Sequence, residues 1–359
     1  MTQTQYIQAA RPAQAPNLKP YSLLGHCIEI CRKNPANLIF PDGEDLRAIS
    51  AAMRIQREQL GSVLLLGRPF RIRELARGEA QGGANPAQPL LVLDHLAPDL
   101  LEHNVKEYMS ILRAGGKSAD EAEAKKFMSL PSAAGAMLVR QGAAETGVGG
   151  NISSTSDMLR AGLRIIGTAP GSRTISSFFF MLAPENSTDS RKVLVFADSG
   201  VIPEPSEEQL VDIAVDSAGQ FKRMTGQEPR VALLSFSSHG SASHPRAEQM
   251  RRIASLVRQK EPGLIIDGEL QFDAAMIPEV ALRKVPDSPL RGEANVLIFP
   301  NLEAGNIGYK IAQRLGGYTA LGPLLQGLNG GWHDLSRGCS AEDIYQVALL
   351  GTALCRSGK

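Results

Sequence analysis

The sequence predicts an α/β protein in which a mainly parallel sheet is covered by helices on both faces. Short segments made only of apolar residues, such as Val193–Ala197 and Val231–Leu234, alternate with longer segments of helical periodicity. Continuous apolar strands are typical of parallel sheets buried on both faces, and their alternation with helices indicates βαβ units. With 359 residues the chain is longer than one compact core usually holds, so two domains are expected.

The first half of the chain shows this alternation from about residue 22 onward. Residues 1–20 are rich in Ala, Gln, Thr and Pro and are expected to form a flexible tail. The elements that follow are expected in this order: a helix at 22–33, a strand at 37–40, a turn at 41–45, a helix at 47–60, a strand at 62–66, a surface loop at 78–89, a strand at 90–93, a helix at 103–128 broken near Gly115-Gly116, a strand around Val148, and a helix from about Thr155.

The second half repeats the pattern more clearly. Strands are expected at 193–197, 231–234, 264–266 and 295–299. The helices between and after them are expected from a capping box at 206–209, at 245–260, after 269, from a loop ending at Asn306 to Arg314, and from Ser340 onward. Polar clusters follow the four strands at 198–200, 235–241, 267–269 and 301–306, so functional side chains are expected at the carboxyl edge of the sheet.

Charge, hydropathy and cysteine content exclude several classes of protein. Lys plus Arg number 38 and Asp plus Glu 37, a balance that argues against a nucleic-acid binder held by bulk electrostatics. No apolar run approaches the roughly 18–20 residues needed to span a bilayer, and the N-terminus lacks the apolar core of a secretory signal. Four cysteines in a chain of this length indicate reduced thiols, and therefore a cytoplasmic protein.

Two near-matches to nucleotide-binding loops are rejected. Gly115-Gly116-Lys117-Ser118 ends like a phosphate-binding loop, but Ile111 stands where the first glycine is required. The segment Gly147–Ile152 begins like a dinucleotide fingerprint and ends in Ile where glycine must stand.

No metal site is predicted, although three groups have suitable residue types. The acids Asp267, Glu269 and Asp273 could hold a divalent cation, but acids at strand ends more often pair with arginines or cap helices. The pairs His239 with His244 and Cys27 with Cys31 have no further zinc ligand close by in the sequence.

The most informative segment is the polar loop from His333 to Asp343, which leads into the last predicted helix. A helix N-terminus offers unpaired N–H groups and a partial positive charge, and Ser336 and Arg337 lie just ahead of it. This arrangement predicts an anion site, most naturally for phosphate, with the carboxylate of Asp343 beside it. Taken alone, Ser340 and Asp343 are better explained as a capping box, and the two roles are compatible.

Three further arginines have simpler explanations when each is taken by itself. Arg47 follows Glu44-Asp45 and could pair with either acid. Arg160 closes a hydroxyl-rich segment that could be an ordinary helix cap, and Arg113 is expected on a helix surface.

Long motifs in the chain resemble those of the phosphate acetyltransferases (phosphotransacetylases). The resemblance runs from about Ala36 to Ala353 and rests on the segments 196–199, 232–237, 240–242, 266–275, 304–315 and 334–340. Within that family the segments 150–155 and 159–167, with His333 where many housekeeping members carry Asn, resemble the ethanolamine-utilisation type.

The resemblance implies an activity and a set of site residues. The reaction would be reversible transfer of an acetyl group between coenzyme A and inorganic phosphate, in a ternary complex without an acyl-enzyme. Asp343 would take the proton of the CoA thiol, Ser336 would hydrogen-bond the thiol or the oxyanion, and Arg337 would hold the phosphoryl group. The residues implied to bind phosphate or CoA are Arg47, Arg113, Arg160, Ser154 and Asn306. CoA, acetyl-CoA, phosphate and acetyl phosphate would be the substrates, with no metal or other cofactor.

The resemblance also implies an architecture and an assembly. Residues 21–168 with 323–359 would form one α/β domain and residues 169–322 a second, in an isocitrate/isopropylmalate dehydrogenase-like arrangement with the active site in the cleft between them. A homodimer is implied. In the ethanolamine context such N-terminal tails can direct enzymes into a bacterial microcompartment, through shell or cargo, although a disordered terminus without a partner is favoured. The alternatives are a phosphate propanoyl- or butanoyltransferase and a noncatalytic microcompartment-associated paralogue.

Overall fold

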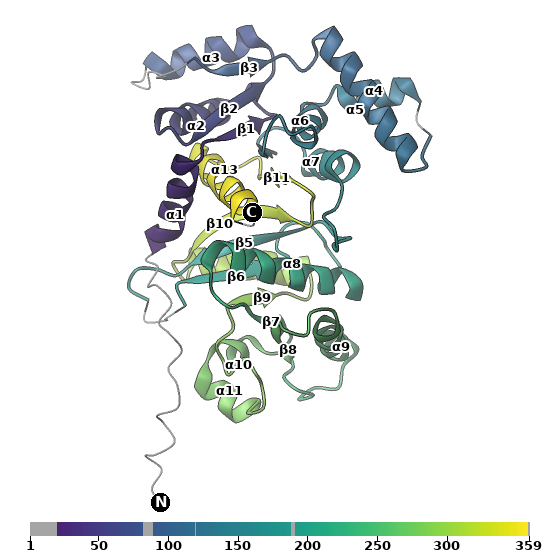
Figure 1. The fold of residues 1–359 in the computed structure, drawn as a ribbon. Helices are drawn as coiled ribbons and strands as arrows, with labels where there is room; N and C mark the ends of the chain where they lie inside the picture. Colours follow the sequence, from purple (N-terminus) through teal and green to yellow (C-terminus); the bar gives the residue numbers. More distant parts are fainter. Residues whose placement is uncertain (1–19, 82–88, 119, 188–190, 358–359) are drawn as a thin grey trace, which may run out of the picture.

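The computed structural model describes residues 20–81, 89–118, 120–187 and 191–357, which form two β-sheets with helices packed around them (Figure 1). The five-stranded sheet, called the first sheet, has the order β11-β4-β1-β2-β3, and all its pairings are parallel. Its strands are β1 (Ala36–Phe40), β2 (Gly61–Leu66), β3 (Leu91–Leu93), β4 (Thr146–Gly149) and β11 (Gly331–Asp334).

The six-stranded sheet, called the second sheet, has the order β10-β5-β6-β9-β7-β8. Its strands are β5 (Ser176–Leu182), β6 (Val193–Ala197), β7 (Arg230–Leu234), β8 (Ile265–Leu270), β9 (Val296–Ile298) and β10 (Thr319–Gln326). Strands β6, β9, β7 and β8 run parallel, whereas β5 pairs antiparallel with both β6 and β10.

The helices connect successive strands and cover the sheets. They are α1 (Pro20–Lys33), α2 (Leu46–Arg57), α3 (Pro69–Gln81), α4 (Pro98–Ala114), α5 (Glu121–Met128), α6 (Pro131–Arg140), α7 (Thr155–Ala161) followed by a π-helical turn at Gly162–Ile166, α8 (Glu207–Thr225), α9 (Pro245–Lys260), α10 (Phe272–Met276), α11 (Pro278–Lys284), α12 (Leu302–Arg314) and α13 (Ala341–Arg356). Several begin at capping residues visible in the sequence; α8, for example, starts with a complete capping box between Ser206 and Gln209.

Helix α13 lies between the two sheets and joins their cores (Figure 1). It packs against α1, α2 and β4 on the side of the first sheet, and against β10 and α8 on the side of the second. One continuous cluster of buried apolar side chains extends from Leu38 through Ile344 and Leu350 to Val195 and Phe221. The last helix of the chain is therefore part of the core of both halves, and its N-terminal end is held on a rigid support.

The chain crosses between the sheets in two segments that lie side by side. One leads from α7 to β5 and the other is the connection of residues 327–330 between β10 and β11. Thr168 and Leu328 form an antiparallel bridge, Ala169 N donates to Gly327 O at 2.9 Å, and Asn329 N donates to Gly167 O at 3.0 Å. These paired connections tie the two halves together.

The predicted α/β class is confirmed, and the predicted strands at 37–40, 62–66, 193–197 and 231–234 are observed within one residue of their expected bounds. Several boundaries were wrong. Residues 267–269, expected to follow a strand, lie inside β8, and His333 and Asp334, expected in a loop, belong to β11. The loop expected to end at Asn306 ends earlier, because Asn301 caps the helix by accepting a hydrogen bond from Ala304 N, so Asn306 lies inside α12.

Two expectations fall wholly or partly outside the described residues. The predicted tail covers residues 1–20, and the structure describes only its last residue, where α1 begins. Of the predicted loop at 78–89, the first residues belong to α3, which extends to Gln81. Among the helices that the structure describes, none combines the length and the apolar character needed to cross a bilayer.

Candidate active site

The loop after β11 ends in a capping box that fixes the carboxylate of Asp343. Asp343 Oδ2 accepts hydrogen bonds from the backbone N–H and the hydroxyl of Ser340, both at 2.8 Å, and Asp343 N donates to Ser340 Oγ at 3.1 Å. The predicted cap is therefore present. Asp343 Oδ1 accepts no hydrogen bond from the described part of the chain, so this oxygen remains able to receive a proton.

Ser336 and Arg337 are exposed at the turn just before α13. The turn is closed by hydrogen bonds from Gly338 N to Ser336 Oγ at 3.2 Å and from Cys339 N to Ser336 O at 2.9 Å. Within the described residues the Arg337 guanidinium makes no hydrogen bond or ion pair. Its planar set of N–H donors is therefore available to an anion.

Arg47, in the first turn of α2, connects three loops. Its Nη1 donates to Arg337 O at 2.8 Å and to Cys339 O at 2.7 Å. Its Nη2 donates to Asn151 O at 2.9 Å and to Asp45 Oδ2 at 2.6 Å, and its Nε donates to Asp45 Oδ1 at 3.0 Å. A guanidinium has five N–H donors, and here each of them has an acceptor in the protein. Arg47 thus fixes the loop that carries Ser336 and Arg337.

The ion pair of Arg47 with Asp45 keeps both groups charged. The hydrogen bonds to Asp45 raise the pKa of Arg47 above its ordinary value. Burial alone would raise the pKa of Asp45, but the hydrogen bonds from Arg47 outweigh burial, and the pKa of Asp45 lies below its usual range. The Asp45 side chain also caps α2 by accepting from Arg47 N, so one carboxylate supports both the helix and the arginine.

Asp42, at the end of β1, holds a second loop, and its role was missed in the sequence. Its buried carboxylate accepts three backbone N–H groups, those of Gly150, Ile152 and Ser153, at 2.9–3.0 Å, and the Ser153 hydroxyl at 2.5 Å. The available signal was the polar turn directly after an apolar strand. Because the segment 150–153 contacts Arg47 through Asn151, Asp42 and Arg47 together define this edge of the first sheet.

Gly150 and Asp334 lie in close contact where β4 and β11 end. Gly150 has φ +92°, and a Cβ there would lie 2.2 Å from Asp334 Oδ1. Only glycine fits both the backbone conformation and the space. Burial raises the pKa of Asp334 to about 7, and the nearby carboxylate of Asp42 acts in the same direction.

Ser154 and Arg160 lie on α7, next to the loop that Asp42 holds. Ser154 is the N-cap of α7, and its hydroxyl also donates to Asp157 Oδ2 at 2.7 Å. Arg160 pairs with Asp157 at 3.3 Å and is exposed. The alternative of an ordinary cap is therefore realised at Ser154, while the arginine remains accessible to solvent.

Asn306 and Arg113 are not in contact with this group of residues. Asn306 Nδ2 donates to Ser199 O at 3.2 Å, in the loop after β6 of the second sheet. Arg113 lies exposed in the last turn of α4, which in Figure 1 projects beyond α6 and α7, away from α13. The structure thus brings together Arg47, Ser336, Arg337 and Asp343, with Ser154 and Arg160 nearby on α7.

The acidic cluster considered for a metal is occupied by basic partners. Asp267 contacts Arg258 and His239, both at 2.9 Å. Glu269 pairs with Arg251 at 3.0 Å. In the parts of the chain that the structure describes, no group of three or more His, Cys, Asp or Glu side chains is arranged to hold a metal ion. All four cysteines are free thiols.

Comparison with known proteins decides the family. The family model described as phosphate acetyl/butaryl transferase matches residues 22–352. The chain belongs to this family. A phosphate acetyltransferase from Paracoccus denitrificans is 43% identical over 315 residues, covering 88% of this chain and 93% of the relative.

Solved structures of this family agree in fold. The EutD phosphotransacetylase from Staphylococcus aureus has 36% identity and a TM-score of 0.82, covering 94% of this chain and 99% of that one. A phosphotransacetylase from Streptococcus pyogenes has 38% identity and a TM-score of 0.85, covering 93% and 98%. The resemblance predicted from the sequence motifs is thereby confirmed.

Proposed function

We propose that this member of the phosphate acetyl/butaryl transferase family is a phosphate acetyltransferase, which converts acetyl-CoA and phosphate reversibly to acetyl phosphate and CoA. Relatives that carry this name are 39–43% identical over about nine tenths of the chain. The observation on which the proposal depends is the pairing of an Arg337 guanidinium without protein partners and an Asp343 carboxylate with one unoccupied oxygen at the start of one helix.

In the direction of acetyl-CoA synthesis, Asp343 acts as the general base. Its Oδ1 takes the proton from the CoA thiol, whose pKa of about 8.5 leaves little thiolate at neutral pH. The sulfur attacks the acetyl carbonyl of acetyl phosphate and a C–S bond forms. The tetrahedral intermediate then collapses, the C–O bond to phosphate breaks, and phosphate leaves.

Arg337 and Ser336 stabilise the charge that develops during this step. The planar guanidinium of Arg337 suits a phosphoryl group. The hydroxyl of Ser336, the preceding residue, can donate to the oxyanion or the thiol. The positive end of α13 favours the same anion. Arg47 acts by holding the carbonyls of Arg337 and Cys339, since direct contact with substrate would require it to release one of its present acceptors.

The remaining residues complete the proposed site. Ser154 and Arg160 on α7 are placed to bind phosphate or CoA beside the loop held by Asp42. Asn306 and Arg113 are proposed substrate contacts that a long ligand such as CoA would reach from the second sheet and from α4. The site lies between two domains, residues 21–168 with 323–359 and residues 169–322, and no metal or further cofactor takes part.

Assembly and location are also proposals. The family resemblance supports a homodimer, and the cysteine content of the chain supports a cytoplasmic location. The likeness to the EutD phosphotransacetylase supports a role in ethanolamine utilisation. The N-terminal residues 1–20 would then be the segment that associates with a microcompartment shell or cargo.

The proposal is tested by coupled assay of thioester formation from acetyl phosphate and CoA. Wild-type protein should turn over, Asp343→Asn should lose roughly 100-fold or more in kcat, and Arg337→Ala roughly 10–100-fold, with circular dichroism spectra unchanged. Near-normal rates in both variants would defeat the assignment of the site. Binding of CoA by wild-type protein with zero turnover would instead favour a noncatalytic paralogue.

The acyl group is tested with the same assay. The family description includes a longer acyl chain, so acetyl-, propanoyl- and butanoyl-CoA should be compared in competition with phosphate present. The proposal requires the highest kcat/KM for the acetyl group, and a preference for butanoyl would replace it by the phosphate butanoyltransferase alternative.

A further inference from the structure

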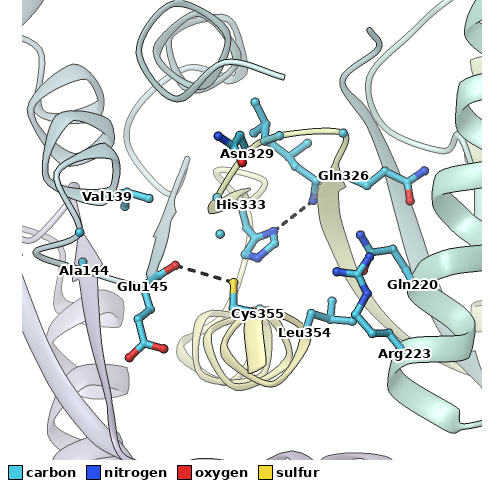
Figure 2. A pocket seen from close by; sticks show the side chains of 17 residues that line it. Val139, Ala144, Glu145, Gln220, Arg223, Gln326, Asn329, His333, Leu354 and Cys355 are labelled. Atoms are coloured by element: carbon cyan, nitrogen blue, oxygen red, sulfur yellow. Dashed lines mark hydrogen bonds between the residues drawn. The ribbon is translucent and has the colours of Figure 1, made fainter. Parts of the chain in front are cut away.

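Asp334, the last residue of β11, has no part in the proposed mechanism although it stands two positions before Ser336. Successive side chains of a strand point to opposite faces. His333 points toward α13, where it lies against Gly351 (Figure 2). Trp332 and Asp334 point the other way, toward α7, and Trp332 Nε1 donates to a backbone carbonyl of that helix at 3.0 Å. The carboxyl group of Asp334 is therefore directed to the side on which α7 and the loop before it lie.

The carboxyl group of Asp334 is enclosed between two loops of the proposed site. The residue is 6% exposed, and Thr155, the first residue of α7, donates a hydrogen bond to the carboxyl group. Asp334 Oδ1 accepts no hydrogen bond from the described residues and lies against Gly150, where an added Cβ would be 2.2 Å away. Next to this contact, Leu335 N donates to Gly149 O at 2.8 Å. The loop after β4 and the loop after β11 are thus joined at this point.

Two buried carboxyl groups flank Gly150, and their surroundings differ. Asp42 accepts three backbone N–H groups and a hydroxyl, which favours its ionised form. Asp334 has the single donor of Thr155 and one oxygen without any, and a buried carboxylate that lacks donors is costly. Burial, reinforced by the charge of Asp42, raises the pKa of Asp334 to about 7. Of the two groups, Asp334 therefore holds the proton.

The other charges on the surrounding elements have partners of their own. Strand β4, which pairs with β11, ends in two glycines and brings no charge. Charged side chains on α2, α7 and α13 are paired as follows: Arg47 with Asp45, Arg160 with Asp157, and Glu342 with Arg54. The carboxylate of Asp343 is held by the cap at Ser340. Asp42 is therefore the charge that acts on Asp334.

We propose that Asp334 is a positioning residue for the acyl transfer, whose neutral form keeps the loop that carries Ser336 and Arg337 in contact with the segment 150–153. The inference rests on the proposed function. When Asp334 gives up its proton to water, a second negative charge lies beside Asp42, and an oxygen without donors lies against Gly150. The carboxylate must then turn toward solvent, and the contact between the two loops is lost.

The test is the pH dependence of kcat/KM for thioester formation in wild type and Asp334→Asn, whose side chain has the same shape and cannot ionise. The ratio of variant to wild type cancels the ionisation of the CoA thiol and of Asp343, which both proteins share. Because the neutral form of Asp334 becomes tenfold rarer per pH unit above its pKa, this ratio should rise roughly 10–100-fold between about pH 7 and 9 and be constant below about pH 6.

A purely structural role would give a different result. Asp334→Asn would then lower kcat/KM by the same factor at every pH, and a ratio independent of pH overturns the proposal. Asp287→Asn, at an exposed aspartate of the second half, is the matched control, and its ratio to wild type should not change with pH. Absence of turnover in the wild type would defeat the proposed function and this inference with it, whereas turnover with a constant ratio defeats the inference alone.

The protonation itself is measured without any assay, by NMR of the full chain with isotope-labelled aspartate carboxyl groups. One carboxyl signal should titrate near pH 7 in wild type and be missing in Asp334→Asn. Asp216 on α8, another buried acid whose pKa is raised by burial to about 6, should titrate in both proteins. A wild-type spectrum with no aspartate titrating above Asp216 would overturn the proposal even if the variant did not fold.

Discussion

The two ends of α13 carry out different tasks with the same helix. At its N-terminal end the side chains of Ser336 and Arg337 are exposed, and the surrounding loop is held by directed hydrogen bonds from Arg47. At its C-terminal end Leu350, Gly351 and Leu354 are buried in contact with both halves of the molecule. The first end depends on polar geometry, and the second on close packing.

This difference indicates which substitutions should alter activity and which should alter stability. Polar groups near solvent contribute little to the free energy of unfolding, whereas their position is critical for a reaction. Changes of packing in a close-packed interior affect stability directly. Substitutions at the N-terminal end should therefore alter activity, and those at the C-terminal end should alter stability.

The largest effect on stability is expected at Gly351. An added Cβ would lie 2.3 Å from His333 Nε2 and 3.0 Å from Thr146 Cγ2, so Gly351→Ala overpacks the interior and should destabilise by about 1–3 kcal/mol. Urea unfolding followed by circular dichroism measures this.

The control for Gly351 is Gly78, which lies exposed in α3 with nothing within 4 Å of an added Cβ. Gly78→Ala should stabilise by about 0.5–1 kcal/mol. Combining Gly351→Ala with His333→Asn should recover part of the loss, because the clash is with the imidazole. A double variant as unstable as the sum of the two single ones would contradict this explanation.

At the N-terminal end, Arg47→Ala and Arg47→Lys should both reduce kcat/KM roughly 10–100-fold, because an ammonium cannot bridge the carbonyls of Arg337, Cys339 and Asn151. Steady-state kinetics with acetyl phosphate and CoA measure this. Arg57→Ala, an exposed arginine at the end of the same helix, is the matched control and should be neutral. Full activity of Arg47→Lys would show that the loop does not need the planar guanidinium of Arg47.

His333 should give the C-terminal end a distinct pH dependence. Burial lowers its pKa from 6.5 to about 4, so below pH 6.5 the unfolded chain binds a proton that the folded chain does not. The stability of wild type relative to His333→Asn should therefore fall as pH drops from 6.5 to 4, by about 3 kcal/mol in all. Asp334, whose pKa is raised to about 7, changes stability in the opposite sense in both proteins and cancels in the difference. Urea unfolding of both proteins at several pH values measures it, and a difference independent of pH would contradict the burial of a neutral imidazole.

The smallest effect is expected for the ion pair of Arg54 with Glu342 in the first turn of α13. Both side chains are substantially exposed, at 36% and 51%, so Glu342→Gln should change the free energy of unfolding by less than about 1 kcal/mol and leave kcat unchanged. A larger loss of stability or of kcat would show that substitutions at this end of the helix have greater effects than the comparison requires.

The sequence was sufficient for elements with a strong local signal. The all-apolar strand at 193–197 and the capping box that begins α8 were predicted because each depends on a few neighbouring residues. The capping box at Ser340 and Asp343 was recognised for the same reason, and the anion-binding interpretation of the adjacent Arg337 followed from helix geometry.

The missed elements depend on partners distant in the chain. Strand β11 is four residues long and half of it is polar, and it becomes a strand by pairing with β4, which was expected around Val148, across almost 200 residues of sequence. The antiparallel strands β5 and β10 were not assigned, although the apolar run at 178–182 within β5 could have been recognised.

The role of Arg47 shows the same limit at a single residue. Its pairing with Asp45, two positions away, was among the possibilities considered from the sequence, whereas Glu44 pairs instead with Arg68. Its bonds to the carbonyls of Arg337 and Cys339 join residues about 290 positions apart. Only the fold brings them together, so the support of the loop that carries Ser336 and Arg337 could not be inferred from local pattern.

The position of α13 between the sheets also affects the order in which the two halves can fold during synthesis. Every strand of the second sheet has been synthesised by Gln326, while the first sheet still lacks β11 and its covering helix. Because domains fold as the chain emerges from its N-terminal end, the second half can mature first and the earlier-made half must wait. The residues made after Gln326 thus close the interior and supply Ser336, Arg337 and Asp343 together, so that a chain cut before them has neither a sealed core nor the proposed site.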